Sequence, residues 1–469
     1  MRYNLDPVFN PRTVMLVGAS RDPNSVGQGI LRNLIRGSVF YSEFARGFSG
    51  NIYPVNPNAS EILGLKCYAS IKDVKDDIDL AIIATPARTV PTIIKQCINK
   101  KVKGIIVISA GFAEIGKQGQ KLQEEIKKSA EKANIPLIGP NCLGIVRPCN
   151  NLNASFAPTM PYAGKIAFVS QSGAIADSII DWAVENRYGF STLISYGNKA
   201  VLDVYDFIEW LEKDPETKAI AIYIEGVGDG RRFMEVARRV SKTKPIIALK
   251  AGRTKKGVAA IASHTGSLAG SYEVYKAAFK QSNVFLAETI EELFDLAKAL
   301  AYQPPVKKNA VVIVTNGGGC GVLCADHCTK LGVNIIELKK STIDRLDATK
   351  KMSPAYNRSN PLDIIGDAMP EQYAAAVNTL LGEDYIHGLI VIQTLQTMTN
   401  PEEDARIVIE AKKKYPEKAV ICTYMGGKYS QRGIRLLESH SIPDYNDLSK
   451  SAKAMWALIE RAKQLNKKA

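Results

Sequence analysis

Histidine is scarce in this chain, which holds only His264, His327, His387 and His440 among 469 residues. The sequence also contains no uncharged apolar run of about 18 residues, the length that a transmembrane helix needs. Its first ten residues, MRYNLDPVFN, lack the apolar core of a secretory signal. These absences argue against a membrane protein and against export, and we therefore expect a cytoplasmic chain.

The eight cysteines follow no regular spacing, which favours reduced thiols over a disulfide framework. Three of them, Cys320, Cys324 and Cys328, recur every fourth residue and share one helix face, with His327 beside them. Zinc sites usually combine two ligand pairs, and no second pair accompanies this group. The pattern predicts small thiols packed under a helix and no metal site.

Basic residues are not interleaved with aromatic residues, although Lys and Arg (61) outnumber Asp and Glu (47) and the formal net charge is +14. The basic residues are spread over predicted surface helices and a short tail, RAKQLNKKA. This distribution does not favour nucleic acid as a partner. We expect a solvated basic surface that attracts polyanionic small ligands or an acidic partner subunit.

Short apolar strands alternate with longer amphipathic stretches along the whole chain, which predicts an α/β fold of parallel sheets covered by helices. We predict three domains, 1–150, 151–302 and 303–469, separated by connectors at 147–165 and 301–309. The second and third blocks open in the same way, with a strand, a turn of small residues and a helix, and so suggest a weak internal duplication.

The first turn, VGASRDPNSVGQG, follows a strand and opens a helix, as in dinucleotide-binding folds. Its glycines, Gly18, Gly27 and Gly29, do not have the expected spacing. Asn56 ends the second strand where an NAD site needs a carboxylate for the ribose hydroxyls. An NAD-dependent oxidoreductase is therefore disfavoured, while another adenosine-phosphate ligand, or a turn without a ligand, remains open.

The stretch GFAEIGKQ (111–118) nearly matches a phosphate-binding P-loop. Gln118 stands where Ser or Thr must bind magnesium, and Glu114 would face the phosphates. The chain therefore has no evident nucleoside triphosphate site of its own.

Three other turns combine small residues with hydroxyl groups. VSQSGA and TNGGGCG each place such residues at a predicted helix start. Backbone N–H groups and the helix dipole attract an anion at such a position. Close packing of the helix on its strand is the alternative explanation for the glycines. IASHTGSLAG places His264 among small residues. The alternative for this stretch is a helix start, with Ser263 or Thr265 capping a helix that begins near Ser271.

Taken together, four stretches resemble the NDP-forming acyl-CoA synthetases, relatives of succinyl-CoA synthetase that include the α subunits of ADP-forming acetyl-CoA synthetases. They are LIGPNCLG, GKIAFVSQSGA, AIYIEGVGD and SHTGSLAG. The resemblance spans the chain and implies a Rossmann-like domain that binds coenzyme A, a flavodoxin-like domain with a phosphorylated histidine, and a second flavodoxin-like ligase-CoA domain. The family's ATP-grasp domains, which bind Mg-ADP or Mg-ATP, are missing, which implies a β subunit in an α2β2 heterotetramer.

The resemblance also implies site residues. His264 corresponds to the phosphorylated residue, Glu225 to the carboxylate that orients it, and Ser172 and Gly173 to the helix start that receives phosphate. The implied coenzyme A contacts are Gly18, Ser20, Gly27, Val55, Asn56, Thr85, Pro86, Ala110, Gly111, Asn141 and Cys142.

The implied reaction converts acyl-CoA, phosphate and ADP to acid, coenzyme A and ATP. Phosphate attacks the acyl carbon, and imidazole, whose pKa of about 6.5 leaves it largely neutral at pH 7, accepts the phosphoryl group from the acyl phosphate. Small residues around His264 would allow its segment to move between two sites. Two alternatives stay open: a module that senses coenzyme A or nucleotide without catalysis, and an α subunit of the succinyl-CoA synthetase type, which the third block disfavours.

Overall fold

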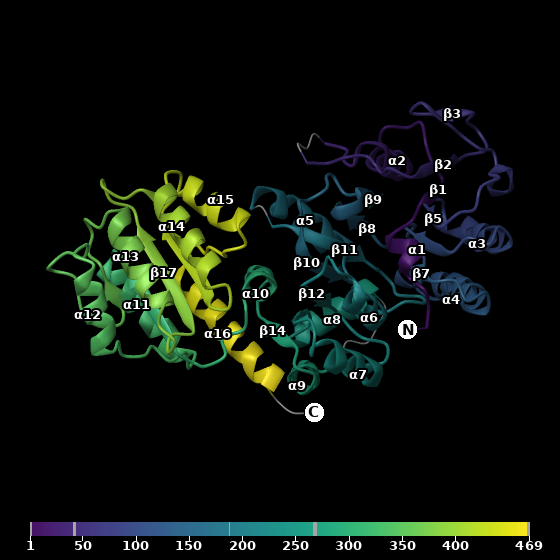
Figure 1. Cartoon of the computed structure of the whole chain (residues 1–469). Helices are drawn as coiled ribbons and strands as arrows, with labels where there is room; N and C mark the ends of the chain where they lie inside the picture. The colour runs from purple at the N-terminus through teal and green to yellow at the C-terminus, as the bar shows by residue number, and fades with distance from the viewer. Residues whose placement is uncertain (1, 41–43, 187, 266–269, 467–469) are drawn as a thin grey trace. The chain divides into compact units, whose positions relative to one another are not determined.

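The computed structural model describes residues 2–40, 44–186, 188–265 and 270–466, without side-chain detail for 262–265. The chain divides into two compact units, Met1–Glu288 and Thr289–Ala469. In both units strands alternate with helices, and most strand pairs are parallel (Figure 1). The predicted α/β fold class is confirmed. Among the described helices, none combines the length and hydropathy of a bilayer span.

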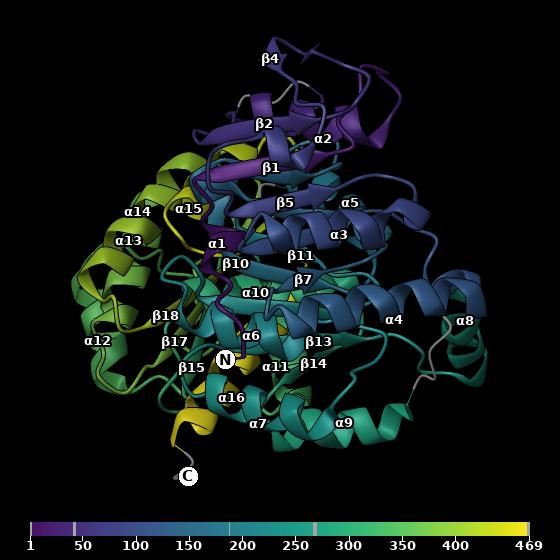
Figure 2. The same ribbon diagram turned by 90° about the vertical axis from the view of Figure 1, so that its right-hand side faces the viewer.

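The first sheet of unit 1 is entirely parallel, in the order β2-β1-β5-β6-β7. Its strands are β1 (Thr13–Val17), β2 (Asn51–Val55), β5 (Leu80–Ile83), β6 (Gly104–Val107) and β7 (Leu137–Ile138). Helices α3 (Val90–Asn99) and α4 (Lys117–Lys132) cover one face (Figure 2), and α1 (Asp6–Phe9) and α2 (Val26–Arg36) cover the other. Because both faces are buried, the strands are nearly continuous apolar runs, and this made them visible in the sequence.

The second sheet of unit 1 has the order β14-β13-β12-β10-β11-β8-β9. Its parallel part consists of β10 (Ala163–Ser170), β11 (Phe190–Ser195), β12 (Ala219–Ile224), β13 (Ile246–Lys250) and β14 (Phe285–Ala287). The helices of this part are α5 (Gly173–Glu185), α6 (Val204–Lys213), α7 (Gly230–Val240), α8 (Lys255–Thr265) and α9 (Tyr272–Gln281). Ser263 and Thr265 lie inside α8, and the N-cap of α9 is Ser271, so neither of the two caps that helix.

An antiparallel hairpin of β8 (Gly144–Arg147) and β9 (Leu152–Ser155) completes this sheet and pairs with β11. The prediction that 147–165 is only a connector was therefore wrong for β9. The strand escapes sequence reasoning because its polar residues are buried: the Asn153 amide donates to the Gly37 carbonyl (2.9 Å), and the Ser155 hydroxyl donates to the Asn153 side chain (2.6 Å). β8 precedes residue 150 but belongs to the second sheet.

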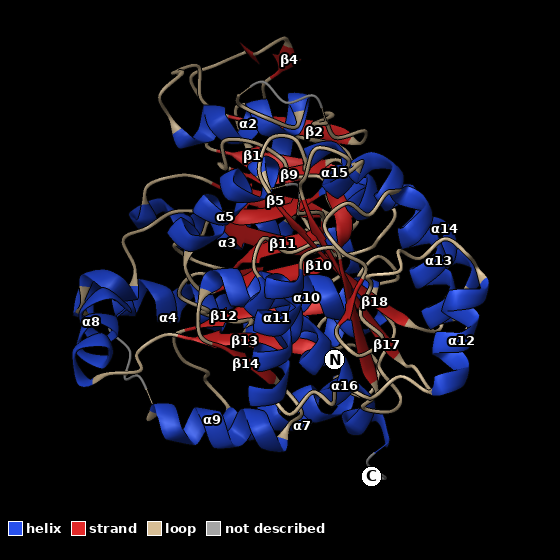
Figure 3. Ribbon diagram, turned by 90° about the vertical axis from the view of Figure 1, so that its left-hand side faces the viewer, coloured by secondary structure: helices blue, strands red, loops and turns tan. Residues whose placement is uncertain are grey.

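Unit 2 holds a parallel sheet in the order β16-β15-β17-β18. Its strands are β15 (Val311–Thr315), β16 (Leu362–Asp363), β17 (Gly388–Thr394) and β18 (Ala419–Met425). One face packs against α13 (Pro370–Leu381), α14 (Pro401–Lys414) and α15 (Gln431–Ser439), whereas α10 (Ile290–Tyr302), α11 (Gly318–Lys330) and α16 (Leu448–Asn466) pack together on the other (Figure 3). α12 (Lys340–Ala348) contacts α13. On α11, the thiols of Cys324 and Cys328 are buried and unoxidised, as expected for core residues.

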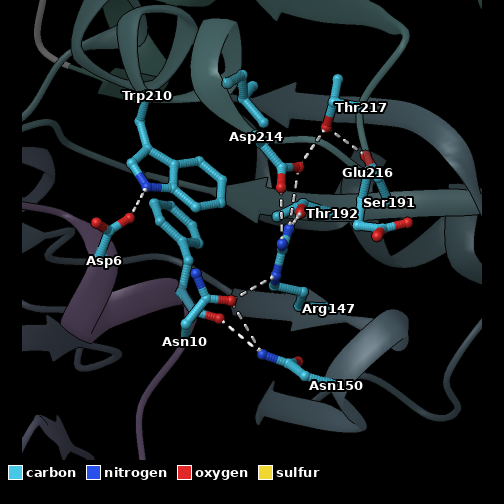
Figure 4. A network of polar contacts seen from close by, with 12 residues as sticks. Asp6, Asn10, Arg147, Asn150, Ser191, Thr192, Trp210, Asp214, Glu216 and Thr217 are labelled. Atoms are coloured by element: carbon cyan, nitrogen blue, oxygen red, sulfur yellow. Dashed lines mark hydrogen bonds and ion pairs between the residues drawn. The ribbon is translucent and has the colours of Figure 1, made fainter.

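A buried ion pair fixes the hairpin to the body of unit 1 (Figure 4). Arg147 makes two hydrogen bonds to the Asp214 carboxylate (2.8 and 3.2 Å), and both side chains are at most 4% exposed. Thr192 accepts from Arg147, and Thr217 donates to Asp214. Burial raises the pKa of Asp214, but the hydrogen bonds from Arg147 and Thr217 outweigh burial and lower it. The carboxylate therefore stays charged inside the protein.

The same cluster anchors α1. Arg147 also donates to the Asn10 side chain (3.2 Å), the Trp210 indole donates to Asp6 (2.8 Å), and the Phe9 ring stacks on Trp210 with centroids 4.1 Å apart. The N-terminal segment is thus tied to β8 and α6, and the two sheets of unit 1 share one core cluster.

We expect Arg147→Met to destabilise unit 1 by about 3–5 kcal/mol, because it leaves Asp214 charged and buried without its partner. Urea unfolding measures this change. The control is Lys165→Met, which removes an ion pair with Glu216 whose two side chains are each 40% exposed, and which should cost under about 1 kcal/mol. Equal losses of unfolding free energy in the two variants would contradict the role of the Arg147–Asp214 ion pair in stabilising unit 1.

Unit 2 contains a buried acid, Asp404, at 1% exposure. The Gln393 amide donates to one of its oxygens (3.1 Å), and the other oxygen has no hydrogen-bond partner in the described part of the chain. Burial raises the pKa of Asp404 to about 7. Because this folded-state pKa lies above the ordinary value, the contribution of Asp404 to stability is fully present below about pH 4, falls between about pH 4 and pH 7, and changes little at higher pH.

We expect Asp404→Asn to stabilise unit 2 by up to about 4 kcal/mol above pH 7 and to have little effect near pH 4, where the carboxyl is neutral in the folded state and only about half ionised in the unfolded state. Thermal unfolding at pH 4 and pH 8 tests this. Glu403→Gln, on the same helical turn but 44% exposed, is the control and should show no such pH dependence. A loss of stability at pH 8 in Asp404→Asn would refute the expectation.

Candidate active site

A pocket of roughly 650 Å³ opens where the carboxyl ends of the two sheets of unit 1 meet. Ligands of open α/β sheets bind at this edge because the loops that follow parallel strands converge there. Of the predicted site residues, the pocket wall contains Thr85, Ala110, Asn141, Cys142, Ser172, Gly173 and Glu225. Residues that follow β5, β6 and β7 of the first sheet thus lie beside residues that follow β10 and β12 of the second.

The other predicted contacts of the first domain do not line this pocket: Gly18, Ser20, Gly27, Val55, Asn56, Pro86 and Gly111. Gly18 has a φ of +97°, and a Cβ on Gly27 would lie 2.0 Å from the Gly18 carbonyl oxygen. Close packing of α2 on the first turn therefore accounts for both glycines without a ligand. The Asn56 amide donates to the Ala19 carbonyl (2.7 Å) and so stabilises the same turn.

The start of α5 presents backbone N–H groups to the pocket. Ser172 is the N-cap, and its side chain accepts from the Ile175 N–H (3.3 Å). The Ser170 hydroxyl donates to the Ser172 carbonyl (2.7 Å) and fixes the preceding turn. Free N–H groups and the helix dipole at such a start attract an anion. The start of α5 thus lines the pocket with Ser172 and Gly173, and the anion site at VSQSGA stays a prediction from sequence.

Glu225 is buried, at 5% exposure, directly after β12. The N–H groups of Glu225 and Gly226 both donate to the Gln171 side-chain oxygen (3.0 and 3.1 Å). The Val227 N–H donates to the Tyr275 hydroxyl (2.9 Å). Side chains from two other segments, Gln171 and Tyr275, therefore hold the loop after β12 in place. Sequence reasoning missed Gln171, although it lies within the quoted motif VSQSGA.

A buried lysine lies next to this loop. Lys250 is 1% exposed and pairs in register with Ile224, the residue before Glu225. Its ammonium donates to the Ala251 carbonyl and lies 4.7 Å from the centre of the Tyr275 ring. Burial lowers the pKa of Lys250, and the charge of Glu225 opposes this. In the sequence, the only indication of this buried lysine is its position at the end of the apolar strand PIIALK.

His264 falls in the last turn of α8. Its side chain, like those of residues 262–269, lies outside the described part of the structure. The role of His264 therefore remains a prediction from sequence.

Glu114 explains why the P-loop-like stretch is not a phosphate site. Its carboxylate accepts from the N–H groups of Gly111 (2.6 Å) and Phe112 (3.1 Å), the groups that would otherwise bind an anion. It also accepts from the Asn198 amide (2.5 Å), whose side chain lines the pocket. Burial raises the pKa of Glu114, but the hydrogen bonds from Asn198 and Gly111 outweigh burial and lower it.

We expect Glu114→Ala to weaken coenzyme A binding by about 10-fold, because Asn198, which lines the pocket, loses the carboxylate that holds its side chain in place. Isothermal titration of coenzyme A into the chain measures this change. Glu124→Ala, on the exposed side of α4, is the matched control and should bind as the wild type does. Unchanged affinity in Glu114→Ala would show that this loop does not shape the ligand site.

Models of three domain families match successive parts of the chain. A CoA binding domain matches residues 12–148, a succinyl-CoA ligase like flavodoxin domain matches 163–300, and a ligase-CoA domain matches 311–463. Each match includes one of the three large sheets or most of its strands.

The chain is similar over its whole length to known enzymes. It is 42% identical to the α subunit of ADP-forming acetate–CoA ligase II of Pyrococcus furiosus, covering 98% of both chains. It is 41% identical to ADP-forming acetate–CoA ligase I of Archaeoglobus fulgidus, of which it covers 63%. Among solved structures, acetyl-coenzyme A synthetase 1 of Ca. Korarchaeum cryptofilum, in complex with phosphate and ADP, is 37% identical with a TM-score of 0.91, covering 99% of this chain and 98% of that one. The chain therefore belongs to the NDP-forming acyl-CoA synthetase family, among whose members are the α subunits of ADP-forming acetate–CoA ligases.

Proposed function

We propose that this chain is the α subunit of an ADP-forming acyl-CoA synthetase that converts acetyl-CoA or a related acyl-CoA, phosphate and ADP to the free acid, coenzyme A and ATP. One observation carries the proposal. The pocket of unit 1 brings the strand ends of the coenzyme A-binding region together with the anion-binding start of α5 and the buried carboxylate of Glu225. A thioester and a phosphate ion can meet there.

The chemistry follows from this arrangement. Coenzyme A would approach across the ends of β5 and β6, near Thr85 and Ala110, and place its thioester beside Ser172. A phosphate ion held by the N–H groups of α5 attacks the acyl carbon, and the coenzyme A thiolate leaves. The helix start stabilises the negative charge on phosphate and acyl phosphate in a partly closed site.

His264 then attacks the phosphorus of the acyl phosphate and releases the carboxylic acid. A carboxylate that accepts a hydrogen bond from the second ring nitrogen fixes the tautomer and stabilises the imidazolium that forms. We assign this role to Glu225, which the contacts of Gln171 and Tyr275 to its loop hold in a fixed position. The phosphohistidine finally transfers its phosphoryl group to ADP.

The nucleotide site would lie on a second polypeptide. The chain covers 98% of separate α subunits of acetate–CoA ligases but only 62–67% of the longer acetate–CoA ligases, which contain additional sequence. We propose an ATP-grasp β subunit that binds Mg-ADP, in an α2β2 heterotetramer. We further propose three domains, at residues 1–150, 151–302 and 303–469. We also propose a cytoplasmic location, because the eight cysteines are free thiols.

We expect ³²P-phosphate and acetyl-CoA, added to the chain and its ATP-grasp partner, to label His264 with a phosphoryl group that is stable to base and labile to acid. Added ADP should remove the label as ATP. His264→Ala should abolish labelling and ATP formation, and Glu225→Gln should slow labelling by about 10²–10³-fold, because the ring loses its orienting charge.

His440→Ala is the control for histidine replacement. His440 lies in unit 2, where its ring nitrogen contacts the Leu436 carbonyl (2.9 Å), and its variant should be labelled normally. A wild-type chain that binds coenzyme A but takes no label would contradict the enzymatic proposal and favour a module that senses coenzyme A.

A further inference from the structure

The pocket has an acidic wall. Within the described part of the chain, the only charged side chains that line it are Asp177 and Glu225, and it has no lysine, arginine or histidine. This is unusual for a chain with a net charge of +14. The mechanism proposed above uses Glu225 but gives no role to Asp177.

Asp177 lies on α5, four residues after Gly173, so the two residues share one face of the helix. Side chains on a helix lean towards its N-terminus. The Asp177 carboxylate therefore leans towards the first turn of α5, where phosphate and the acyl carbon would meet. One carboxylate oxygen is buried and has no hydrogen-bond partner among the described residues.

Two large apolar side chains lie in the same wall. Val26, at the start of α2, is 44% exposed, and Phe156, after β9, is 40% exposed, and both line the pocket. Ala174, next to the phosphate-binding turn, adds a methyl group. Such a surface suits the hydrocarbon part of an acyl group, and Asp177 is the one charged group of α5 that lines it.

We infer that Asp177 is a specificity-determining residue that restricts the acyl group to those without a negative charge, and so excludes acyl groups derived from dicarboxylic acids. This inference rests on the proposed function of the pocket. The free carboxylate of such an acyl group would enter a partly closed site. The described residues that line this site contribute two carboxylates and no cation. Like charges repel strongly in such a site, since little water screens them. The volume of roughly 650 Å³ does not by itself exclude a short dicarboxylic acyl chain.

Burial raises the pKa of Asp177, and the nearby charge of Asp181 raises it further. A carboxylate of the acyl group beside Asp177 would add to this effect, and it would lack the helix N–H groups that offset the charge of phosphate at the start of α5.

The test uses two stable analogues of acyl-CoA that differ by one carboxylate, S-ethyl-CoA and S-(2-carboxyethyl)-CoA. Isothermal titration with the whole chain gives the affinity for each, without any need for turnover. We expect the wild type to bind S-ethyl-CoA at least about 10-fold more tightly, which corresponds to about 1.4 kcal/mol. Asp177→Asn, which keeps the shape and removes the charge, should reduce this preference to about 2-fold or less.

Asp181→Asn is the matched control. It removes the same charge one turn further along α5, from an exposed residue that does not line the pocket, and it should keep the wild-type preference. In the complex with the ATP-grasp partner, Asp177→Asn should also raise the ratio of succinate to acetate turnover by about 10-fold.

Equal binding of the two analogues by the wild type, or an unchanged preference in Asp177→Asn, would overturn the inference. A wild type that binds neither analogue would instead contradict the coenzyme A-binding function on which the inference rests. The two failures are therefore distinguishable.

Discussion

The candidate active site depends on the contact between two loops of unit 1, one from each sheet. The N–H groups of Asn198 and Ala200 donate to the carbonyls of Pro140 (2.9 Å) and Gly139 (3.0 Å), and the Leu143 N–H donates to the Ser195 hydroxyl (3.1 Å). The backbones approach so closely that a Cβ on Gly197 would lie 2.1 Å from the Asn141 carbonyl oxygen. These contacts place the strand ends of the first sheet against the start of α5, and the proposed attack of phosphate on the thioester needs that proximity.

Carboxylates organise the surroundings of this contact. Glu114 occupies the backbone N–H groups of the P-loop-like turn and holds Asn198. Asp203 accepts from the Gly228 N–H (2.7 Å) in the loop after β12. Asp214 holds Arg147 and, through it, the β8–β9 hairpin at the edge of the second sheet. Each of these acids has hydrogen-bond partners, which is the condition for a charge inside a protein. Among the described residues that line the pocket, Asp177 and Glu225 are the charged ones, and we assign the binding of phosphate to the start of α5 as part of the proposed function.

Much of this fold was visible in the sequence, and the reasons are physical. Strands buried on both faces, such as β1 and β17, are continuous apolar runs, and Gly or Ser at their ends marks the edge where ligands bind. The β9 strand was missed because Asn153 and Ser155 are polar residues whose hydrogen bonds are made by distant segments. A pattern within one segment cannot reveal such partners.

The sequence predicted the site residues that lie within short motifs but not those that are distant in sequence. Residues within short motifs, such as Ser172 and Glu225, do line one pocket. Tyr275 and Lys250 lie next to the Glu225 loop, although they are 50 and 25 residues away in sequence. Nothing local in the sequence marks Tyr275, and Lys250 is marked only as the lysine that ends an apolar strand. Asp177 lies among ordinary helical residues, and only the pocket distinguishes it from Asp181.

A crystal structure of the chain with acetyl-CoA and vanadate, a phosphate analogue, would test the central claim most directly. The account predicts that the thioester sulfur lies between Asn141 and the first turn of α5, with the oxyanion on the N–H groups that follow Ser172. A thioester bound away from this turn, or an oxyanion bound elsewhere in unit 1, would contradict it.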